Sequence, residues 1–136
     1  MVDKAVPIVL RERCGVTEIL VFDHPLAGRQ LVKGTVEAGE EIEAAAVREL
    51  AEESGIVDVA RTIYLGTQNY AGIKQRWHFV LCELKSPVGE DWAHYTEDGG
   101  GLVFRFLWQP IDQPIDNPDG HVFEQARLFM CQAVRN

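Results

Sequence analysis

The chain has 136 residues, of which 46% are hydrophobic and 25% charged, and its formal net charge is −8. This length and balance are typical of one globular domain with its own hydrophobic core. The acidity and the lack of Lys/Arg clusters argue against duplex nucleic acid as a partner. No apolar run approaches the length of a transmembrane helix, so we expect no membrane partner.

Cysteine usage and the N-terminus bear on the compartment. Cys14, Cys82 and Cys131 lie far apart and form no C-x-x-C motif, so we expect reduced packing residues rather than disulfides or a zinc site. The apolar run at residues 5–10 is short and is followed at once by Arg11. We therefore expect no secretory signal and a cytoplasmic location.

Residue periodicity predicts two kinds of element in chain order. Alternating, β-branched and aromatic residues predict strands at 5–11, 18–22, 61–68, 76–84 and 102–108. Helical spacing predicts helices at Ile42–Ser54 and 121–134, and loops are expected at 23–30, 85–101 and 110–120. Strands with two separated helices favour an α/β/α sandwich.

The most informative segment is residues 34–56, GTVEAGEEIEAAAVRELAEESGI, with seven glutamates against one arginine and so a local charge of −6. Gly55 fits the left-handed position that ends many helices. On the predicted helix Glu49, Glu52 and Glu53 are spaced i, i+3 and i+4 and share one face, where like charges repel. A cation among them removes that repulsion, and hard oxygen ligands select Mg²⁺ or Mn²⁺.

The other residues of this helix have predicted places too. An apolar face, expected to pack on a sheet, is formed by Ala44, Val47, Leu50, Ala51 and Ser54. Ala45 and Ala46 are expected to flank the acidic face and leave open space above it. Arg48 lies between the two faces, where it is placed to pair with neighbouring carboxylates and hold their rotamers.

The same segment carries a complete family motif, G-x5-E-x7-R-E-U-x-E-E-x-G-U, where U is a bulky aliphatic residue. The nine matching residues are Gly34, Glu40, Arg48, Glu49, Leu50, Glu52, Glu53, Gly55 and Ile56. On this motif the chain resembles the Nudix hydrolases, and the element order agrees over essentially the whole chain. The resemblance implies an α/β fold, a Nudix-type α/β/α sandwich with a mixed β-sheet, as a single domain over residues 1–136.

The resemblance also implies an activity: a Mg²⁺- or Mn²⁺-dependent pyrophosphohydrolase. Its substrate is expected to be a nucleoside diphosphate linked to another group, of the dinucleoside polyphosphate, NTP or nucleotide-sugar type. Glu49, Glu52 and Glu53, with the backbone carbonyl of Gly34 or of Lys33, are the expected metal ligands. Glu52, Glu53 and Arg48 are the expected catalytic residues.

Several candidates lie outside the motif. Lys33 ends the run LVKG, which resembles the LPKG entry of Nudix proteins that cleave dinucleoside polyphosphates, and is a candidate phosphate contact. The Tyr expected at 72–74 in those enzymes is missing. Glu97 is the candidate remote acid and an alternative to Glu52 as the general base. For both Lys33 and Glu97, ordinary solvent exposure is the competing interpretation.

Three more basic residues are candidate substrate contacts. Arg76 and His78 share one face of a predicted strand, and Arg29 lies in a predicted loop. Trp77, on the opposite face of the strand, is either a base-stacking residue or a core residue.

Two other functions remain open. A catalytically silent Nudix domain binds a nucleotide or ADP-ribose-like ligand as a sensor, although such domains usually lose acidic positions that are all present here. An isomerase or another metal-assisted enzyme on the same fold is the third reading, because fold alone does not fix function. The protein is expected to be a monomer or a homodimer.

Overall fold

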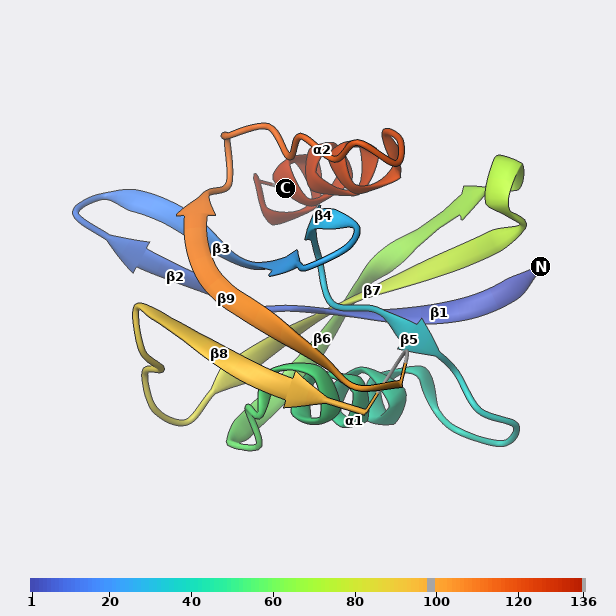
Figure 1. Cartoon of the computed structure of the whole chain (residues 1–136), viewed down its shortest axis with the longest axis horizontal. Coiled ribbons are helices and arrows are strands. Elements are labelled where there is room, and N and C mark those ends of the chain that lie inside the picture. The colour runs from blue at the N-terminus through green and yellow to red at the C-terminus, as the bar shows by residue number, and fades with distance from the viewer. Residues whose placement is uncertain (98–99, 136) are drawn as a thin grey trace. The chain divides into compact units, whose positions relative to one another are not determined.

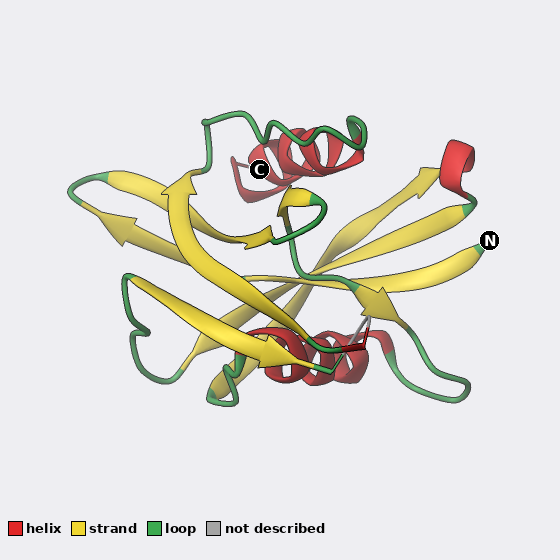
Figure 2. Ribbon diagram, in the orientation of Figure 1, coloured by secondary structure: helices red, strands yellow, loops and turns green. Residues whose placement is uncertain are grey.

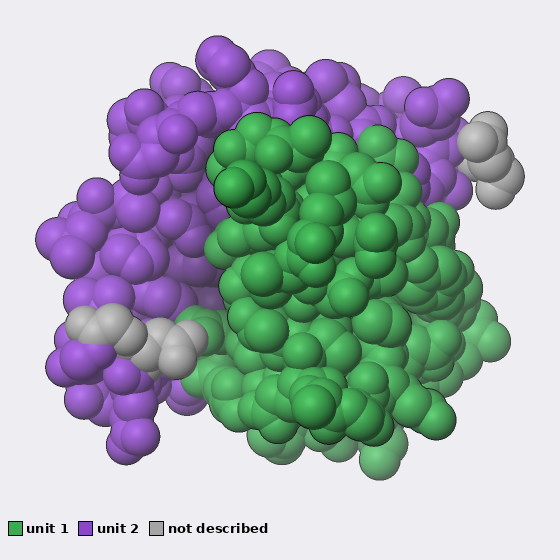
Figure 3. Space-filling view, turned by 90° about the vertical axis from the view of Figure 1, so that its right-hand side faces the viewer, with its two compact units in different colours: residues 1–9, 32–87 green, residues 10–31, 88–136 purple. Residues whose placement is uncertain are grey.

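The structure is a computed structural model that describes residues 1–97 and 100–135 (Figure 1). Strands and helices follow one another in a mixed order along the chain (Figure 2). The chain divides into two compact units: residues 1–9 with 32–87, and residues 10–31 with 88–136 (Figure 3). No helix in the described part of the chain combines the length and the apolar character that a bilayer crossing requires.

Unit 1 contains a four-stranded mixed sheet and the first helix. Its elements are β1 (Val2–Ile8), β5 (Gly34–Thr35), α1 (Ile42–Ser54), β6 (Val59–Tyr70), the short 3₁₀ helix η1 (Ala71–Ile73) and β7 (Gln75–Leu84). The strand order is β5-β1-β7-β6, in which β1 and β7 are parallel and the other pairs antiparallel. Helix α1 contacts β1, β5, β6 and β7.

Unit 2 contains an antiparallel sheet and the second helix. Its elements are β2 (Leu10–Arg13), β3 (Val16–His24), β4 (Gly28–Gln30), β8 (Asp91–Thr96), β9 (Leu102–Pro110) and α2 (Val122–Arg135). The strand order is β2-β3-β9-β8, with β4 paired to β3. The buried Arg127 ties α2 to the segment after β9 by donating to the Ile111 carbonyl at 2.8 Å.

The predicted class, a mixed α/β fold with two helices, is confirmed, whereas some boundaries are wrong. The strand predicted at 5–11 is two strands in two sheets, because β1 ends at Ile8 and β2 begins at Leu10. All five residues from 5 to 9 are buried, so no alternation marks the change of sheet. The loop predicted at 85–101 contains β8, and the loop predicted at 23–30 contains β4. β8 lies at the edge of its sheet and contains several polar residues, so its composition resembles that of a loop.

Helix α1 begins and ends where the sequence predicts, but a different face is buried. Gly55 follows it with φ 82°, the predicted left-handed conformation, and its N–H donates to the Ala51 carbonyl. Ala45 and Ala46 are fully buried while Ala44 is exposed. The expectation that Ala44 packs on the sheet and that Ala45 and Ala46 leave open space is therefore wrong. Small side chains at 45 and 46 let the helix approach the sheet closely.

One buried hydroxyl in unit 1 has no hydrogen-bond partner among the described residues, that of Tyr70. Burial raises the pKa of Tyr70 to about 12, and its ring contacts Trp77 edge-on at 5.0 Å between centroids. An unsatisfied buried hydroxyl costs about 1–3 kcal/mol. The Tyr70→Phe variant removes that cost and keeps the ring.

We predict that Tyr70→Phe raises the free energy of unfolding by about 1 kcal/mol, measured by chemical denaturation. Tyr64→Phe is the matched control, because the Tyr64 hydroxyl bonds to His78 Nδ1 at 3.1 Å and is exposed. That change should leave the protein equally or less stable. A Tyr70→Phe protein that is less stable than the wild type contradicts the prediction.

Candidate functional site

The three glutamates Glu49, Glu52 and Glu53 of helix α1 differ in how deeply they are buried. Glu49 and Glu53 are 6% and 4% exposed, whereas Glu52 is exposed. The i, i+4 pair thus lies on the buried side of the helix, and Glu52 lies at the rim. Two adjacent buried carboxylates are unfavourable unless positive charge or hydrogen-bond donors surround them.

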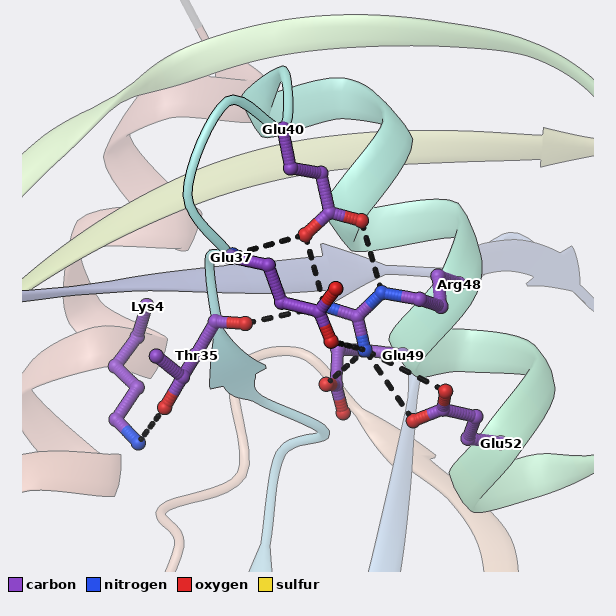
Figure 4. Close-up of polar contacts among 7 residues, drawn as sticks. All are labelled: Lys4, Thr35, Glu37, Glu40, Arg48, Glu49 and Glu52. Carbon is purple, nitrogen blue, oxygen red and sulfur yellow. Dashed lines mark hydrogen bonds and ion pairs between the residues drawn. The ribbon is translucent and has the colours of Figure 1, made fainter.

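The positive charge at this site comes from Arg48, whose guanidinium bonds to several oxygens (Figure 4). Its Nε and Nη2 donate to Glu40 at 2.8 and 2.9 Å, and its Nη1 donates to Glu49 at 2.7 Å. Nη1 also lies 3.3 Å from Glu52, and Nη2 donates to the Thr35 carbonyl at 3.1 Å. One guanidinium therefore connects the loop before α1, the strand β5 and two glutamates of the helix.

The short strand β5 makes room for the Glu49 carboxylate. Gly34 pairs with Ala5 of β1, and a Cβ added at Gly34 would lie 1.8 Å from the Glu49 carboxyl carbon. No side chain fits at residue 34 unless Glu49 moves. The glycine is needed here for space rather than for a left-handed backbone.

The ionisation states follow from these contacts. The hydrogen bond from Arg48, with a backbone donation from Glu37, lowers the pKa of Glu40 to about 2. The Glu40 and Glu49 carboxylates in turn raise the pKa of Arg48 above its ordinary value. Arg48 and Glu40 are therefore both charged throughout the neutral range.

Two lysines lie close to this cluster. Burial, followed by the charge of Lys4, lowers the pKa of Lys33, while Glu53 and Glu49 act in the opposite direction. The Lys33 ammonium lies 5.7 Å from the centre of the Trp77 ring, and Lys4 donates to the Thr35 hydroxyl at 2.8 Å. Lys33 thus places a partly desolvated positive charge within electrostatic range of the buried glutamates.

The atoms of this cluster that could bind a metal suit a hard cation. Each of them is a carboxylate or carbonyl oxygen, and the space left by Gly34 admits the Glu49 carboxylate against β5. Within the described ranges, 1–97 and 100–135, no three acidic, His or Cys side chains converge as a metal cage. Mg²⁺ typically takes one or two carboxylates and completes its shell with water and substrate phosphates, so these residues fit it.

Arg76 and His78 form a separate polar cluster in unit 1. His78 Nε2 lies 2.9 Å from Asp3, and its Nδ1 lies 3.0 Å from the Thr67 hydroxyl. Arg76 also contacts Asp3, at 3.3 Å. These contacts link β1, β6 and β7, and the substrate contact predicted for Arg76 and His78 stays a prediction.

Three other candidates are placed by the structure. Trp77 is fully buried in unit 1, so it is a core residue and the base-stacking alternative is wrong for this structure. Arg29 belongs to unit 2, where it pairs with Asp23 at 2.8 Å. Glu97 also belongs to unit 2 and is an exposed residue directly after β8.

Sequence reasoning missed some members of the site. Glu40 is part of the motif, yet its role as the main partner of Arg48 was not assigned. The Thr35 carbonyl and Lys4 were not anticipated, since neither a backbone oxygen nor a strand lysine has a distinctive spacing. The strand pairing of β1 with β5, which brings Lys4 opposite Thr35, is a non-local contact that residue patterns do not report.

One comparison with known proteins shows a family, and another shows the fold. The sequence model of the NUDIX domain matches residues 2–130. Comparison with curated proteins by sequence gives no significant match. Among the solved structures that resemble the chain, three have sequence identities of 15–19%, a level that shows the fold alone.

The first two of these structures come from bacterial Nudix family proteins. One, a Chromobacterium violaceum protein assigned to the nudix hydrolase family, has a TM-score of 0.65 at 19% identity over 99% of this chain and 77% of its own. The other, a mutT/nudix family protein from Listeria innocua, has a TM-score of 0.65 at 16% identity over 98% and 94%.

The third is the NUDIX domain of Shewanella oneidensis NrtR, solved in complex with ADP ribose. It has a TM-score of 0.68 at 15% identity over 99% of this chain and 88% of its own.

The depressed pKa of Glu40 predicts an acid dependence of stability. A carboxylate with a lowered folded-state pKa stabilises the fold above its unfolded pKa, near 4.5, and that contribution is lost as pH falls toward about 2. We expect the loss of stability between pH 4.5 and 2 to be shallower in Glu40→Gln than in the wild type, in denaturant titrations across that range. Equal slopes for the two proteins contradict the assignment.

Removing the guanidinium should be more costly than breaking a surface ion pair. Arg48→Gln leaves Glu40 and Glu49 without their charged donor, so we expect a loss of about 2 kcal/mol in the free energy of unfolding. Arg61→Gln is the control, because Arg61 forms a two-point pair with Glu83 whose members are both exposed. Similar losses in the two variants would show that Arg48 has no special structural role.

Proposed function

Because the chain belongs to the NUDIX domain family, we propose that it is a Mg²⁺-dependent pyrophosphohydrolase. Its substrate would be a nucleoside diphosphate linked to another group, and residues 1–136 would act as one Nudix domain. The observation that carries the proposal is the arrangement around Gly34: two buried glutamates, one rim glutamate and one arginine, with space for a carboxylate against β5. Such an arrangement is costly for stability alone and suits cation-assisted phosphate chemistry.

The residues have separate roles in this proposal. Glu49, Glu52 and Glu53, with the carbonyl of Gly34, hold the divalent cation that Nudix enzymes generally use. When bound, Mg²⁺ or Mn²⁺ supplies a Lewis acid for pyrophosphate oxygens and lowers the pKa of bound water. Arg48 fixes the rotamer of Glu49 and also contacts Glu52 at the rim. Glu52 is the proposed general base, which would accept a proton from the attacking water.

Lys33 is the proposed phosphate contact. Its ammonium is partly desolvated and lies within electrostatic range of Glu49 and Glu53. A positive charge in that environment stabilises negative charge on a leaving phosphate more strongly than an exposed lysine does. Arg29 and the remote acid Glu97, both in unit 2, are secondary proposals for substrate contact and proton transfer.

A nucleoside diphosphate linked to another group is the substrate class with the most support. The similar NrtR domain is complexed with ADP ribose, in which a pyrophosphate joins two groups. The same comparison supports the alternative, a silent domain that binds such a ligand as a sensor. The intact set of glutamates favours catalysis, because a sensor has no need for a cation site that burdens the helix with repulsion.

A panel of nucleotides tests this choice. The wild-type protein is incubated with ADP-ribose, dinucleoside polyphosphates, NTPs and nucleotide sugars, with Mg²⁺ and in EDTA, and the phosphorylated products are separated. Turnover of at least one substrate class only with the cation supports the enzyme. Tight binding without turnover supports the sensor. Near-normal activity of Glu49→Gln, Glu52→Gln and Glu53→Gln, each tested alone, contradicts the proposed metal ligands.

Gly34→Ala gives a sharper test of the carboxylate position. The new methyl must displace Glu49, and a shift of about 1 Å in a catalytic group costs on the order of 100-fold in rate. We expect that loss in kcat with little change in thermal stability, because the displaced group is the end of a flexible side chain. Gly72→Ala is the control, since an added methyl there meets no atom within 4 Å, and it should leave kcat unchanged.

A further inference from the structure

Unit 2 contains a hollow that none of the roles above uses. Its volume is about 550 Å³, within the range of about 300–1,000 Å³ that is usual for small-molecule sites. It is lined by residues of β2, β3, β9, the start of β8 and the residue before β8, among them Arg11, Arg13, Arg105, Glu90 and Trp108. It is large enough for a ligand the size of a mononucleotide.

The guanidinium of Arg11 is held by contacts on more than one side in this hollow. It stacks over the Trp108 ring with its carbon 4.4 Å from the ring centre, and its Nε donates to Glu18 at 2.7 Å. Its two terminal nitrogens, Nη1 and Nη2, form a fork that donates to the two carboxylate oxygens of Glu90 at 3.2 and 2.8 Å. An arginine fixed on two sides in this way presents a preorganised two-point donor to an anion.

Glu90 binds that donor from the Pro- and Gly-containing segment between β7 and β8. Its side chain is 60% exposed and also forms an ion pair with Arg13. The Trp108 indole N–H donates to the adjacent Gly89 carbonyl at 3.0 Å. Because exposed ion pairs contribute little to stability, a dissolved anion of the same geometry can replace the Glu90 carboxylate.

The charges around the hollow are mixed, but several of the acids have partners of their own. The lining has three arginines and four acids, but Glu18 is already paired with Arg11, and Asp23 with Arg29. Once Glu90 is displaced, Arg13 and Arg105, which also line the hollow, add positive charge to that of Arg11. Asp91 remains as an opposing charge, which limits the affinity.

We propose that this hollow binds the phosphate group of a small ligand, and that Glu90 takes the place of that phosphate in the ligand-free protein. A phosphate offers two oxygens at the spacing of a carboxylate and an additional charge, so it meets the Arg11 fork and Arg13 together. The site requires no divalent cation, in contrast to the proposed catalytic site on α1.

The test measures binding of adenosine monophosphate and of inorganic phosphate to the full-length protein in excess EDTA, by calorimetry and by Trp fluorescence. Glu90→Gln removes the internal competitor, so we expect about threefold tighter binding. Arg11→Gln removes the fork, so we expect at least about tenfold weaker binding. Thermal unfolding confirms that each variant is folded, and Arg11→Lys, which keeps the charge without the fork, should fall between the wild type and Arg11→Gln.

The chain offers a matched control in the pair Arg61–Glu83, which has the same two-point geometry but lies in unit 1 and outside the hollow. Arg61→Gln and Glu83→Gln should leave the affinity unchanged. Tighter binding of adenosine monophosphate than of phosphate identifies a phosphate ester as the ligand, and equal binding identifies free phosphate. No binding of either, or equal effects of Glu90→Gln and Glu83→Gln, overturns the proposal.

The metal-free design separates this proposal from the proposed function. Glu53→Gln should abolish turnover but leave binding in EDTA intact. Binding in EDTA that is lost in Glu53→Gln would place the ligand at the glutamates of α1 and contradict a site in the hollow.

Discussion

The guanidinium of Arg48 is the interaction on which the arrangement of unit 1 depends. Glu49 and Glu53 are nearly fully buried on one helix face, and Glu40 lies across from them on the loop before α1. Without a cation, their mutual repulsion and desolvation oppose the close packing of α1 on its sheet. Arg48 offsets this by joining Glu40, Glu49 and the Thr35 carbonyl through a rigid planar group, so that loop, helix and β5 are fixed together.

The space at Gly34 gives this electrostatic arrangement its geometry. Strand β5 has only two residues, and it pairs with β1 so that Gly34 faces the end of Glu49. A buried carboxylate is held here against backbone rather than against another side chain, which keeps its oxygens directed to a defined place. The positive charges of Lys33 and Lys4 border the same region. The cluster therefore places buried carboxylate oxygens and positive charge side by side, which is the arrangement that the proposed cation-assisted phosphate chemistry needs.

Residue patterns predicted what is local and missed what is not. The bounds of α1 and the left-handed Gly55 follow from helix propensity and capping, which act within a few residues. The buried face of α1 was predicted wrongly because open space was expected above the acidic face, whereas Glu49 and Glu53 are buried beside Ala45 and Ala46. Their burial depends on Gly34 and Arg48, which lie outside that face. The division of residues 5–11 between two sheets left no trace in a fully buried run. For the candidate site, the residue spacing of the motif predicted the glutamates and Arg48, whereas Thr35 and Lys4 were found only in the tertiary structure.

Arg48 and Arg11 both bind carboxylates through the guanidinium nitrogens, but the two contacts differ in how easily they are replaced. The burial of the partner carboxylates explains this difference. Arg48 meets carboxylates whose side chains are 16% and 8% exposed, so its contacts are shielded from water and salt and their loss leaves charges desolvated. Arg11 meets Glu90, whose side chain is 60% exposed, so a solvated anion competes with that contact on nearly equal terms. Stacking on Trp108 keeps the Arg11 guanidinium in place whichever anion it holds. The first arrangement is thus suited to fixing a catalytic geometry, and the second to exchanging one ligand for another.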